Sequence, residues 1–184
     1  AAGIPHGFST RVGGVSPEPF DSLNLGLADA PGEPDTWERV QENWRRFMAA
    51  VGLQDRAPIR VRQVHGVGIR HADLDAGVPR ADPPFADGDA LVSADPGQAL
   101  SVRVADCAPV LLADPRASLV AAVHAGWRGV AQGIVPATIR SMEQRGASAE
   151  RMIVAVGACI GGNALQVGAE VAEAMRLANL SEAV

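Results

Sequence analysis

A series of short apolar stretches between residues 88 and 126 limits most strongly how this chain can fold. Residues 88–95 (GDALVSAD), 99–114 (ALSVRVADCAPVLLAD) and 118–126 (SLVAAVHAG) have the length and apolar content of β-strands. Pro109 cannot donate to a strand ladder, so we expect a strand to end or bend there. Further strands are expected in residues 58–66 (PIRVRQVHG) and 151–161 (RMIVAVGACIG). Because several strands follow one another directly, the sequence predicts an α+β fold whose mixed β-sheets are flanked by helices.

Helical periodicity occurs in three other segments. A helix is expected from Asp35, as N-cap with Glu38 completing a capping box, to a stop at Gly52. Its tryptophans recur at helical spacing and are expected to fill a core. Residues 130–146 read as a helix with a kink or restart at Pro136, and residues 168–180 read as a closing helix. Residues 5–34 read as an ordered loop with short extended pieces. With no linker or internal repeat, residues 1–184 are expected to form a single domain.

Composition and charge exclude several classes of function. Lys and Arg number 16 against 21 Asp and Glu, giving a net charge of -5 without a basic cluster. Nucleic acid and anionic membranes are therefore not expected partners. The start of the chain does not resemble a signal peptide, and no apolar run approaches a membrane span. Two cysteines are too few for a disulfide scaffold, so a cytoplasmic location is expected.

Three residues with metal-binding side chains fall at the expected ends of strands. They are His65, Cys107 and His124. Their wide separation is unlike that of small structural zinc modules, so only a fold that gathers strand ends could unite them. Two histidines and a cysteine with an open fourth position would form a catalytic type of zinc site. The alternative is that Cys107 is a small buried residue and that each histidine has an ordinary structural role.

Other polar residues near these positions have two readings each. Asp106 could orient a histidine or act as a base, or could cap a turn. Arg128 could clamp an anion, or could be a surface charge at a helix start. Arg11, in the glycine-flanked segment STRVGG, invites the same anion-binding reading. Gln63 is expected to line the end of a strand beside His65 and, like Asp89, to contact substrate. Trp127 either walls a pocket or packs in the core.

Seven segments together resemble one family. STRVGGVS, SLNLGL, RQVHG, GDALVS, VADCAPVLLAD, VAAVHAGWRG and QVGAEV occur here in the order found in laccase-domain proteins. This family was named for multicopper polyphenol oxidoreductase activity, and its members have been described as purine nucleoside phosphorylases with adenosine deaminase activity. The resemblance runs from about residue 5 to residue 174. It implies a zinc site at His65, Cys107 and His124, and a fold similar to that of cysteine deamidase toxins.

The chain also departs from the family pattern. The C-terminal segment of the family, with a stretch like FSYRRD, has no match here, so we expect the chain to lack it. VGACIGG replaces the usual GPCIG, and an aromatic residue usually found near Leu165 is missing. These differences put the activity of this chain alone, and its stacking on a purine, in question.

The leading functional hypothesis is a zinc-dependent purine nucleoside enzyme. It would cleave adenosine, inosine and methylthioadenosine with phosphate to give the base and ribose 1-phosphate, and would deaminate adenosine. Arg11 or Arg128 could bind phosphate, Asp89 or Asp106 could supply a carboxylate, and Cys107 and His124 would lie at the catalytic centre. The partners would be a nucleoside and phosphate.

Four alternatives remain open at the level of sequence. Cys107 and His124 could form a metal-free hydrolase or deamidase, and the metal site could serve an amidase acting on a cell-wall precursor. A structural zinc module is a further possibility. A copper-dependent polyphenol oxidase is disfavoured by only four histidines without a His-x-His pair, although copper could occupy the site.

Overall fold

A computed structural model describes residues 3–26, 35–75 and 86–180. Parts of the expected 5–34 loop and the last four residues lie outside this description. The chain divides into two compact units, Ala1–Pro58 and Ile59–Val184, which are described separately below. The expectation of a single domain stays a prediction. Among the described residues, no helix combines the length and apolar character required to cross a membrane.

The first unit is built on one amphipathic helix, α1 (Trp37–Ala50). Its buried residues are Val40, Asn43, Trp44 and Met48. The N-cap is Thr36 and not Asp35, because the Asp35 carboxylate is buried and accepts hydrogen bonds from Ser16 and Asn24. Gly52 ends the helix as expected: its φ of 75° is a left-handed conformation that favours glycine.

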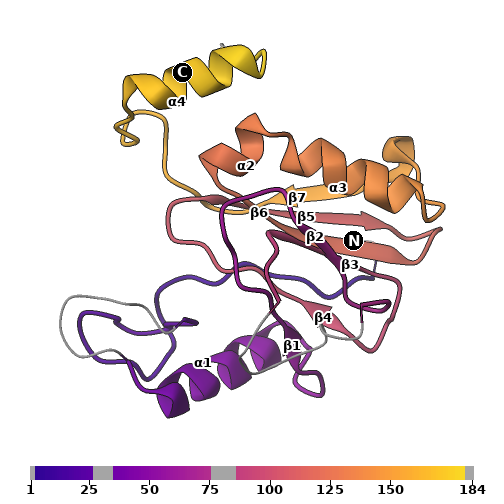
Figure 1. Ribbon diagram of the computed structural model, residues 1–184. Helices are drawn as coiled ribbons and strands as arrows, with labels where there is room; N and C mark the ends of the chain where they lie inside the picture. Colours follow the sequence, from indigo (N-terminus) through magenta and orange to yellow (C-terminus); the bar gives the residue numbers. More distant parts are fainter. Residues whose placement is uncertain (1–2, 27–34, 76–85, 181–184) are drawn as a thin grey trace. The chain divides into compact units, whose positions relative to one another are not determined.

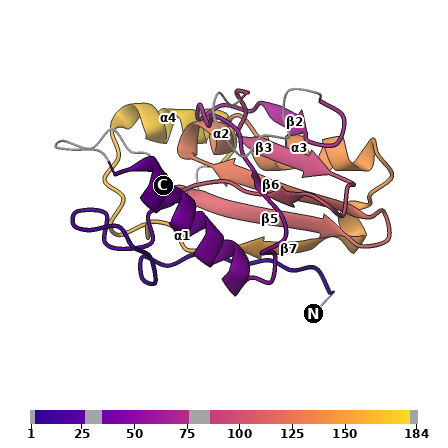
Figure 2. The same cartoon turned by 90° about the horizontal axis from the view of Figure 1, so that it is seen from below.

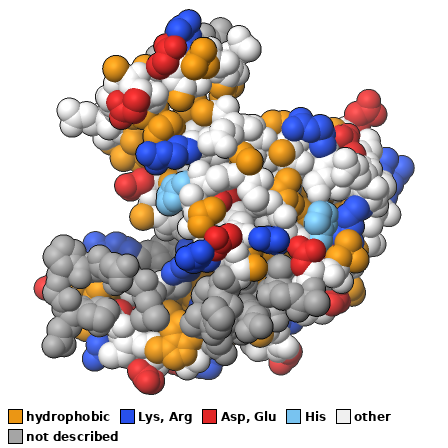
Figure 3. All heavy atoms as spheres, viewed as in Figure 1, with side chains coloured by type: hydrophobic (Ala, Val, Ile, Leu, Met, Phe, Trp, Pro, Cys, Tyr) orange, Lys and Arg blue, Asp and Glu red, His pale blue; other side chains and the backbone are white. Residues whose placement is uncertain are grey.

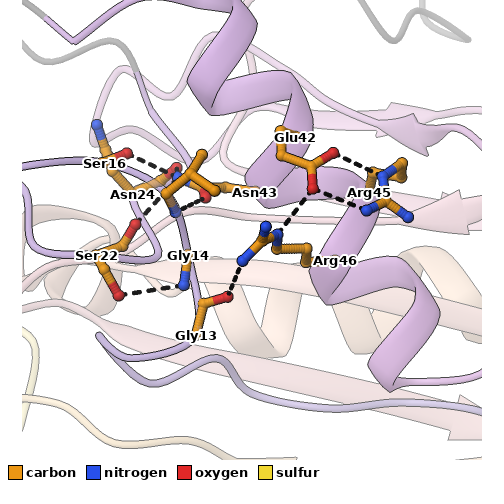
Figure 4. A network of polar contacts seen from close by, with 10 residues as sticks. Gly13, Gly14, Ser16, Ser22, Asn24, Glu42, Asn43, Arg45 and Arg46 are labelled. Atoms are coloured by element: carbon orange, nitrogen blue, oxygen red, sulfur yellow. Dashed lines mark hydrogen bonds and ion pairs between the residues drawn. The ribbon is translucent and has the colours of Figure 1, made fainter.

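The loop of the first unit is ordered by the buried amide of Asn43 (Figure 4). Its Oδ1 accepts from the Val15 backbone N–H at 2.8 Å, and its Nδ2 donates to Ser16 Oγ and to the Asn24 carbonyl, each at 2.8 Å. Arg46 reaches the carbonyl of Gly13 while pairing with Glu42. The described part of the loop is therefore ordered, as expected, although it contains no strand.

The second unit contains a five-stranded mixed sheet with the order β2-β3-β6-β5-β7 (Figure 2). The strands are β2 (Ile69–His71), β3 (Ala90–Ser93), β5 (Ala108–Asp114), β6 (Leu119–Ala125) and β7 (Ile153–Val156). Only the β2–β3 pair is parallel, and the other pairs are antiparallel. The short strands β1 (Pro58–Ile59) and β4 (Ala99–Leu100) form a second, two-stranded sheet.

Helices cover one face of the large sheet (Figure 1). They are α2 (Trp127–Ala131) and α3 (Ile134–Glu143). A 3-10 turn at Ala149–Arg151 follows α3, and the last helix, α4 (Ala169–Leu177), contacts α2 and lies away from the sheet. Ile134 and Met142 of α3 are fully buried against Ala90, Val92 and Val123 of the sheet. Leu91 points to the opposite face and packs with Ile59 and Val61. This two-sided burial explains why every residue of β3 is buried.

The α+β class with a mixed sheet is confirmed, and several expected boundaries are not. The strand expected over residues 58–66 ends after Ile59, and only Arg62 forms a further isolated bridge. Pro109 lies inside β5 instead of ending a strand; it is the second residue, where a missing donor is tolerated. Pro136 lies in the first turn of α3, where proline fits a helix. The similarity to cysteine deamidase toxins stays a prediction.

Candidate metal centre

The antiparallel sheet brings two of the expected metal ligands to one edge. His124 lies near the end of β6, whose Ala125 pairs with Ala108 at the start of β5. Cys107 directly precedes β5. The expectation that it ends a strand is therefore wrong. Because neighbouring antiparallel strands run in opposite directions, the start of β5 meets the end of β6. His65 arrives from the turn before β2, and the ligand atoms of all three side chains lie within 4.8 Å of one another.

Asp89 contacts the ring of His124 through its carboxylate. It directly precedes β3, and both side chains are buried. Asp89 Oδ1 lies 2.8 Å from His124 Nδ1. A carboxylate accepts hydrogen bonds, so Nδ1 carries the proton and Nε2 is left with a lone pair for a metal. This carboxylate–histidine pair is the arrangement that commonly fixes a metal-binding histidine.

The same carboxylate shapes the turn that presents His65. The backbone N–H groups of Val64, His65 and Gly66 donate to Asp89 at 3.3, 2.9 and 2.8 Å. His65 has a φ of 59°, a left-handed conformation that is uncommon outside glycine. The three hydrogen bonds stabilise this conformation, so one buried residue positions two of the candidate ligands. The rings of His65 and His124 meet edge to face, with centroids 4.7 Å apart.

Two glycines of the HAGWRG segment leave room for this arrangement. A Cβ atom placed on Gly126 would lie 3.0 Å from His65 Cδ2 and 3.1 Å from Cys107 Sγ. A Cβ atom on Gly129 would lie 2.9 Å from the carbonyl oxygen of Gly66. Larger residues would therefore press on the candidate ligands or on the turn that carries them.

The surroundings of Cys107 favour a cation at this point. Burial, together with the negative charges of Asp106 and Asp89, raises the pKa of the Cys107 thiol. A positive metal ion would offset these charges and stabilise the thiolate. The cluster of two nitrogen ligands and one sulfur ligand could therefore hold a metal, and it suits zinc or copper by donor type.

The other expected site residues have different positions. Asp106 is exposed beside Cys107, and Asp89, not Asp106, contacts the histidine. Gln63 uses its amide on the Arg103 backbone: Nε2 donates to the carbonyl at 2.6 Å and Oε1 accepts from the N–H at 2.8 Å. Its expected contact with substrate stays a prediction.

The two candidate anion-binding arginines lie in different units. Arg128 is exposed on α2, two residues beyond Gly126, and its guanidinium stacks 4.3 Å from the centroid of the Trp127 ring. Arg11 belongs to the first unit, where it pairs with Asp21 at 2.6 Å. On the face shown in Figure 3, described side chains of both charges are interspersed and form no single basic patch.

Sequence reasoning missed three features of this site. The contact of the buried Asp89 carboxylate with His124 and with the backbone was not expected, and its expected role toward substrate stays a prediction. The contact with His124 follows from the antiparallel pairing of β3 with β6, which no local pattern in the sequence signals. Neither the left-handed backbone of His65 nor the close approach at Gly126 can be read from residue spacing.

Comparisons with known proteins give relatives along nearly the whole chain. A protein of Deinococcus radiodurans named purine nucleoside phosphorylase is 43% identical over 97% of this chain and 66% of its own length. Purine nucleoside phosphorylase YfiH of Escherichia coli K12 is 40% identical over 90% of this chain and 63% of its own length. The chain thus spans slightly less than two thirds of these relatives.

Solved structures show the same fold. YlmD from Geobacillus stearothermophilus matches with a TM-score of 0.81 and 30% identity, covering 91% of this chain and 62% of that protein. NMB0706 from Neisseria meningitidis matches with a TM-score of 0.75 and 34% identity, covering 90% of this chain and 62% of that protein. A family model described as multi-copper polyphenol oxidoreductase laccase matches residues 5–183, and the chain belongs to this family.

Proposed function

We propose that this chain carries the metal centre of a zinc-dependent purine nucleoside phosphorylase that also deaminates adenosine. The observation that carries the proposal is the convergence of His65, Cys107 and His124, with Asp89 behind His124. The names of the relatives supply the substrate class, a purine nucleoside with phosphate. Adenosine, inosine and methylthioadenosine are the proposed nucleosides.

The buried pair of Asp89 and His124 determines which ring nitrogen of His124 carries the proton and which keeps a lone pair. Asp89 keeps the proton on His124 Nδ1, so Nε2 faces His65 and Cys107 as a ligand atom. When bound, zinc would supply a Lewis acid that activates water or polarises a substrate atom. Because Asp89 is shielded from solvent, it holds this geometry without competing for substrate.

Phosphorolysis requires an anion site and a proton donor. The bond between the sugar C1′ and the purine nitrogen breaks, a phosphate oxygen bonds to C1′, and the purine receives a proton. Arg128 is exposed close in sequence to the ligand set, and stacking on Trp127 orients its guanidinium. We assign it to phosphate. Asp106, exposed beside Cys107, is the proposed general acid.

Deamination would use the same centre with water as the nucleophile. Water adds to the purine carbon that bears the amino group, and ammonia leaves. The incoming water must lose a proton and the leaving amine must gain one, so a single carboxylate can serve both steps. Asp106 is again the proposed group, because it is the exposed carboxylate next to a ligand.

The electrostatics of Cys107 weigh against a metal-free thiol hydrolase. A nucleophilic cysteine works as a thiolate, which requires a lowered pKa. Here burial and two carboxylates raise the pKa of Cys107. A copper polyphenol oxidase would need several metal ions, whereas the described residues contain one cluster of suitable ligands.

Metal content is the first test. The purified chain is expected to contain close to one zinc per molecule, measured by mass spectrometry of metals. Cys107→Ala should lose the metal, whereas Cys159→Ala should retain it because Cys159 is exposed and outside the cluster. Equal metal content in the parent and in Cys107→Ala would contradict the proposed ligand set.

Turnover is the second test. Adenosine and inosine are incubated with and without phosphate, and the products are separated by chromatography. We expect adenine or hypoxanthine only with phosphate, and inosine from adenosine without it. Arg128→Ala should raise the KM for phosphate, and Arg116→Ala, an exposed arginine at the far end of β5, is its control. Bound metal without turnover would contradict the proposed activity and favour a structural zinc module.

A further inference from the structure

The two cysteines of the chain lie opposite each other in the register of two paired strands. Strands β5 and β7 pair antiparallel, with Val110 opposite Val156 and Ala113 opposite Ile153. Beyond β7 the two segments stay joined by two further backbone hydrogen bonds. Gly157 N–H donates to the Pro109 carbonyl, and Ile160 N–H donates to the Asp106 carbonyl, each at 3.0 Å. Counting along both segments places Cys159 opposite Cys107.

This placement would bring the two backbones within reach of a disulfide. Residues directly opposite in an antiparallel pair have Cα atoms about 4.5–5.5 Å apart, and disulfides join Cα atoms about 4.4–6.8 Å apart. Both cysteines are free thiols, and Cys159 is exposed. Cys159 lies beyond the end of β7, next to the Ile160 N–H that bonds to the Asp106 carbonyl.

The Cys107 sulfur has two mutually exclusive uses. Its Sγ is one of the three atoms of the candidate metal cluster, which does not include Cys159. Forming a bond to Cys159 requires the Cys107 side chain to turn away from the histidines. A sulfur in a disulfide is no longer a thiolate ligand, so one bond would remove a third of the protein ligands.

We propose that Cys107 and Cys159 form a reversible disulfide that empties the metal centre under oxidising conditions. The oxidant is a peroxide. The exposed Cys159 thiol loses its proton, its sulfur attacks one peroxide oxygen and the O–O bond breaks; a sulfenic acid forms, and the departing hydroxide takes up that proton as water. The Cys107 sulfur then attacks the sulfenic sulfur, and the hydroxyl leaves with the Cys107 proton as a second water. The disulfide stands independently of the proposed enzyme activity, whereas the release of metal rests on the proposed metal centre.

The bond itself is tested on metal-free protein. The chain is treated with hydrogen peroxide, the remaining thiols are blocked, and tryptic peptides are analysed without reduction. Cleavage after arginine puts Cys107 in residues 104–116 and Cys159 in residues 152–176. We expect these two peptides to be linked within one molecule, and separated again by dithiothreitol. Their absence, or links only between molecules, would overturn the proposal.

Release of the metal is tested on zinc-loaded protein with a chromogenic chelator. Peroxide should release zinc from the parent, and dithiothreitol should restore binding. In Cys159→Ser, which keeps the three ligands, release should be at least about tenfold slower and should not be reversed by dithiothreitol. Equal release from the parent and from Cys159→Ser would contradict the coupling. A linked peptide pair in a chain that binds no zinc would uphold the disulfide and count against the proposed metal centre.

Discussion

Two buried aspartates, at opposite ends of the same sheet, have nearly the same surroundings. Asp89 lies before β3 and accepts hydrogen bonds from three backbone N–H groups and from His124. Asp114 ends β5 and accepts from the backbone N–H groups of Arg116, Ala117 and Ser148 and from the guanidinium of Arg151. Both carboxylates have no exposed surface.

The difference between the two sites lies in the fourth partner. Arg151 is a permanent cation whose donor closes the set around Asp114. His124 belongs to the candidate metal cluster, and its bond to Asp89 leaves its second ring nitrogen available as a ligand atom. The same buried-carboxylate arrangement thus stabilises a loop around Asp114 at one end of the sheet. At the other end, around Asp89, it orients a candidate ligand. Burial of a carboxylate does not by itself identify a functional residue. What distinguishes Asp89 is that its partner, His124, keeps a second nitrogen that can act as a ligand.

Replacing each aspartate by asparagine is the most direct test of the difference between the two sites. Both changes put an amide NH₂ against backbone donors, so both metal-free proteins should melt at lower temperature. Asp89→Asn should also weaken zinc binding by about 10–100-fold, because the His124 tautomer is no longer fixed. Asp114→Asn should leave zinc affinity unchanged. Zinc affinity is measured by competition with a chelator, and equal losses in both variants would show that folding alone controls the site.

A smaller loss of zinc affinity is expected from Gly126→Ala. Its backbone has a φ of -74°, which alanine adopts freely, so only the added Cβ matters. That atom would crowd His65 and Cys107, and we expect about tenfold weaker zinc binding. Gly161→Ala is the matched control, since no atom lies within 4 Å of its added Cβ. The same competition titration reads out both variants, and unchanged affinity in Gly126→Ala would contradict the close approach.

The pH dependence of stability tests the role of Asp114. Burial acts to raise the pKa of Asp114, but the hydrogen bonds from Ser148, Arg151, Ala117 and Arg116 outweigh it and lower the pKa to about 2. A carboxylate with a lowered pKa stabilises the folded state fully above its unfolded pKa of about 3.9, and this contribution is lost as the pH falls through its folded value.

The measurement is the difference in unfolding free energy between the parent and Asp114→Asn. It should be constant above about pH 5 and should shrink as the pH falls toward about 2. Denaturant titrations of the metal-free proteins at several pH values give this difference, and groups common to both proteins cancel. A difference that grows in acid would mean that Asp114 is not the carboxylate stabilised by folding.

The sequence predicted the fold class and the three residues of the candidate metal cluster better than it predicted the contacts around them. Apolar patterning located β3 and β6 as short apolar runs, and α3 by its helical period. It failed over residues 60–65, where side-chain bonds replace a backbone ladder. The role of Asp89 depends on which strands pair and in which direction, and this information is absent from local patterns.

The smallest expected effect concerns the side-chain hydrogen bonds of Gln63, which take the place of strand pairing. The two bonds from Gln63 to the Arg103 backbone imitate a peptide pairing and hold the segment that leads into the His65 turn. Gln63→Ala should lower the unfolding free energy by about 1 kcal/mol, since the site is only half-buried. Gln98→Ala removes a comparable amide contact to the carbonyl of Ala72, away from the cluster, and is the control. If Gln63 only supports the turn, both variants lose stability in denaturant titrations and the KM for nucleoside stays unchanged. A raised KM in Gln63→Ala alone would instead place this amide in contact with substrate.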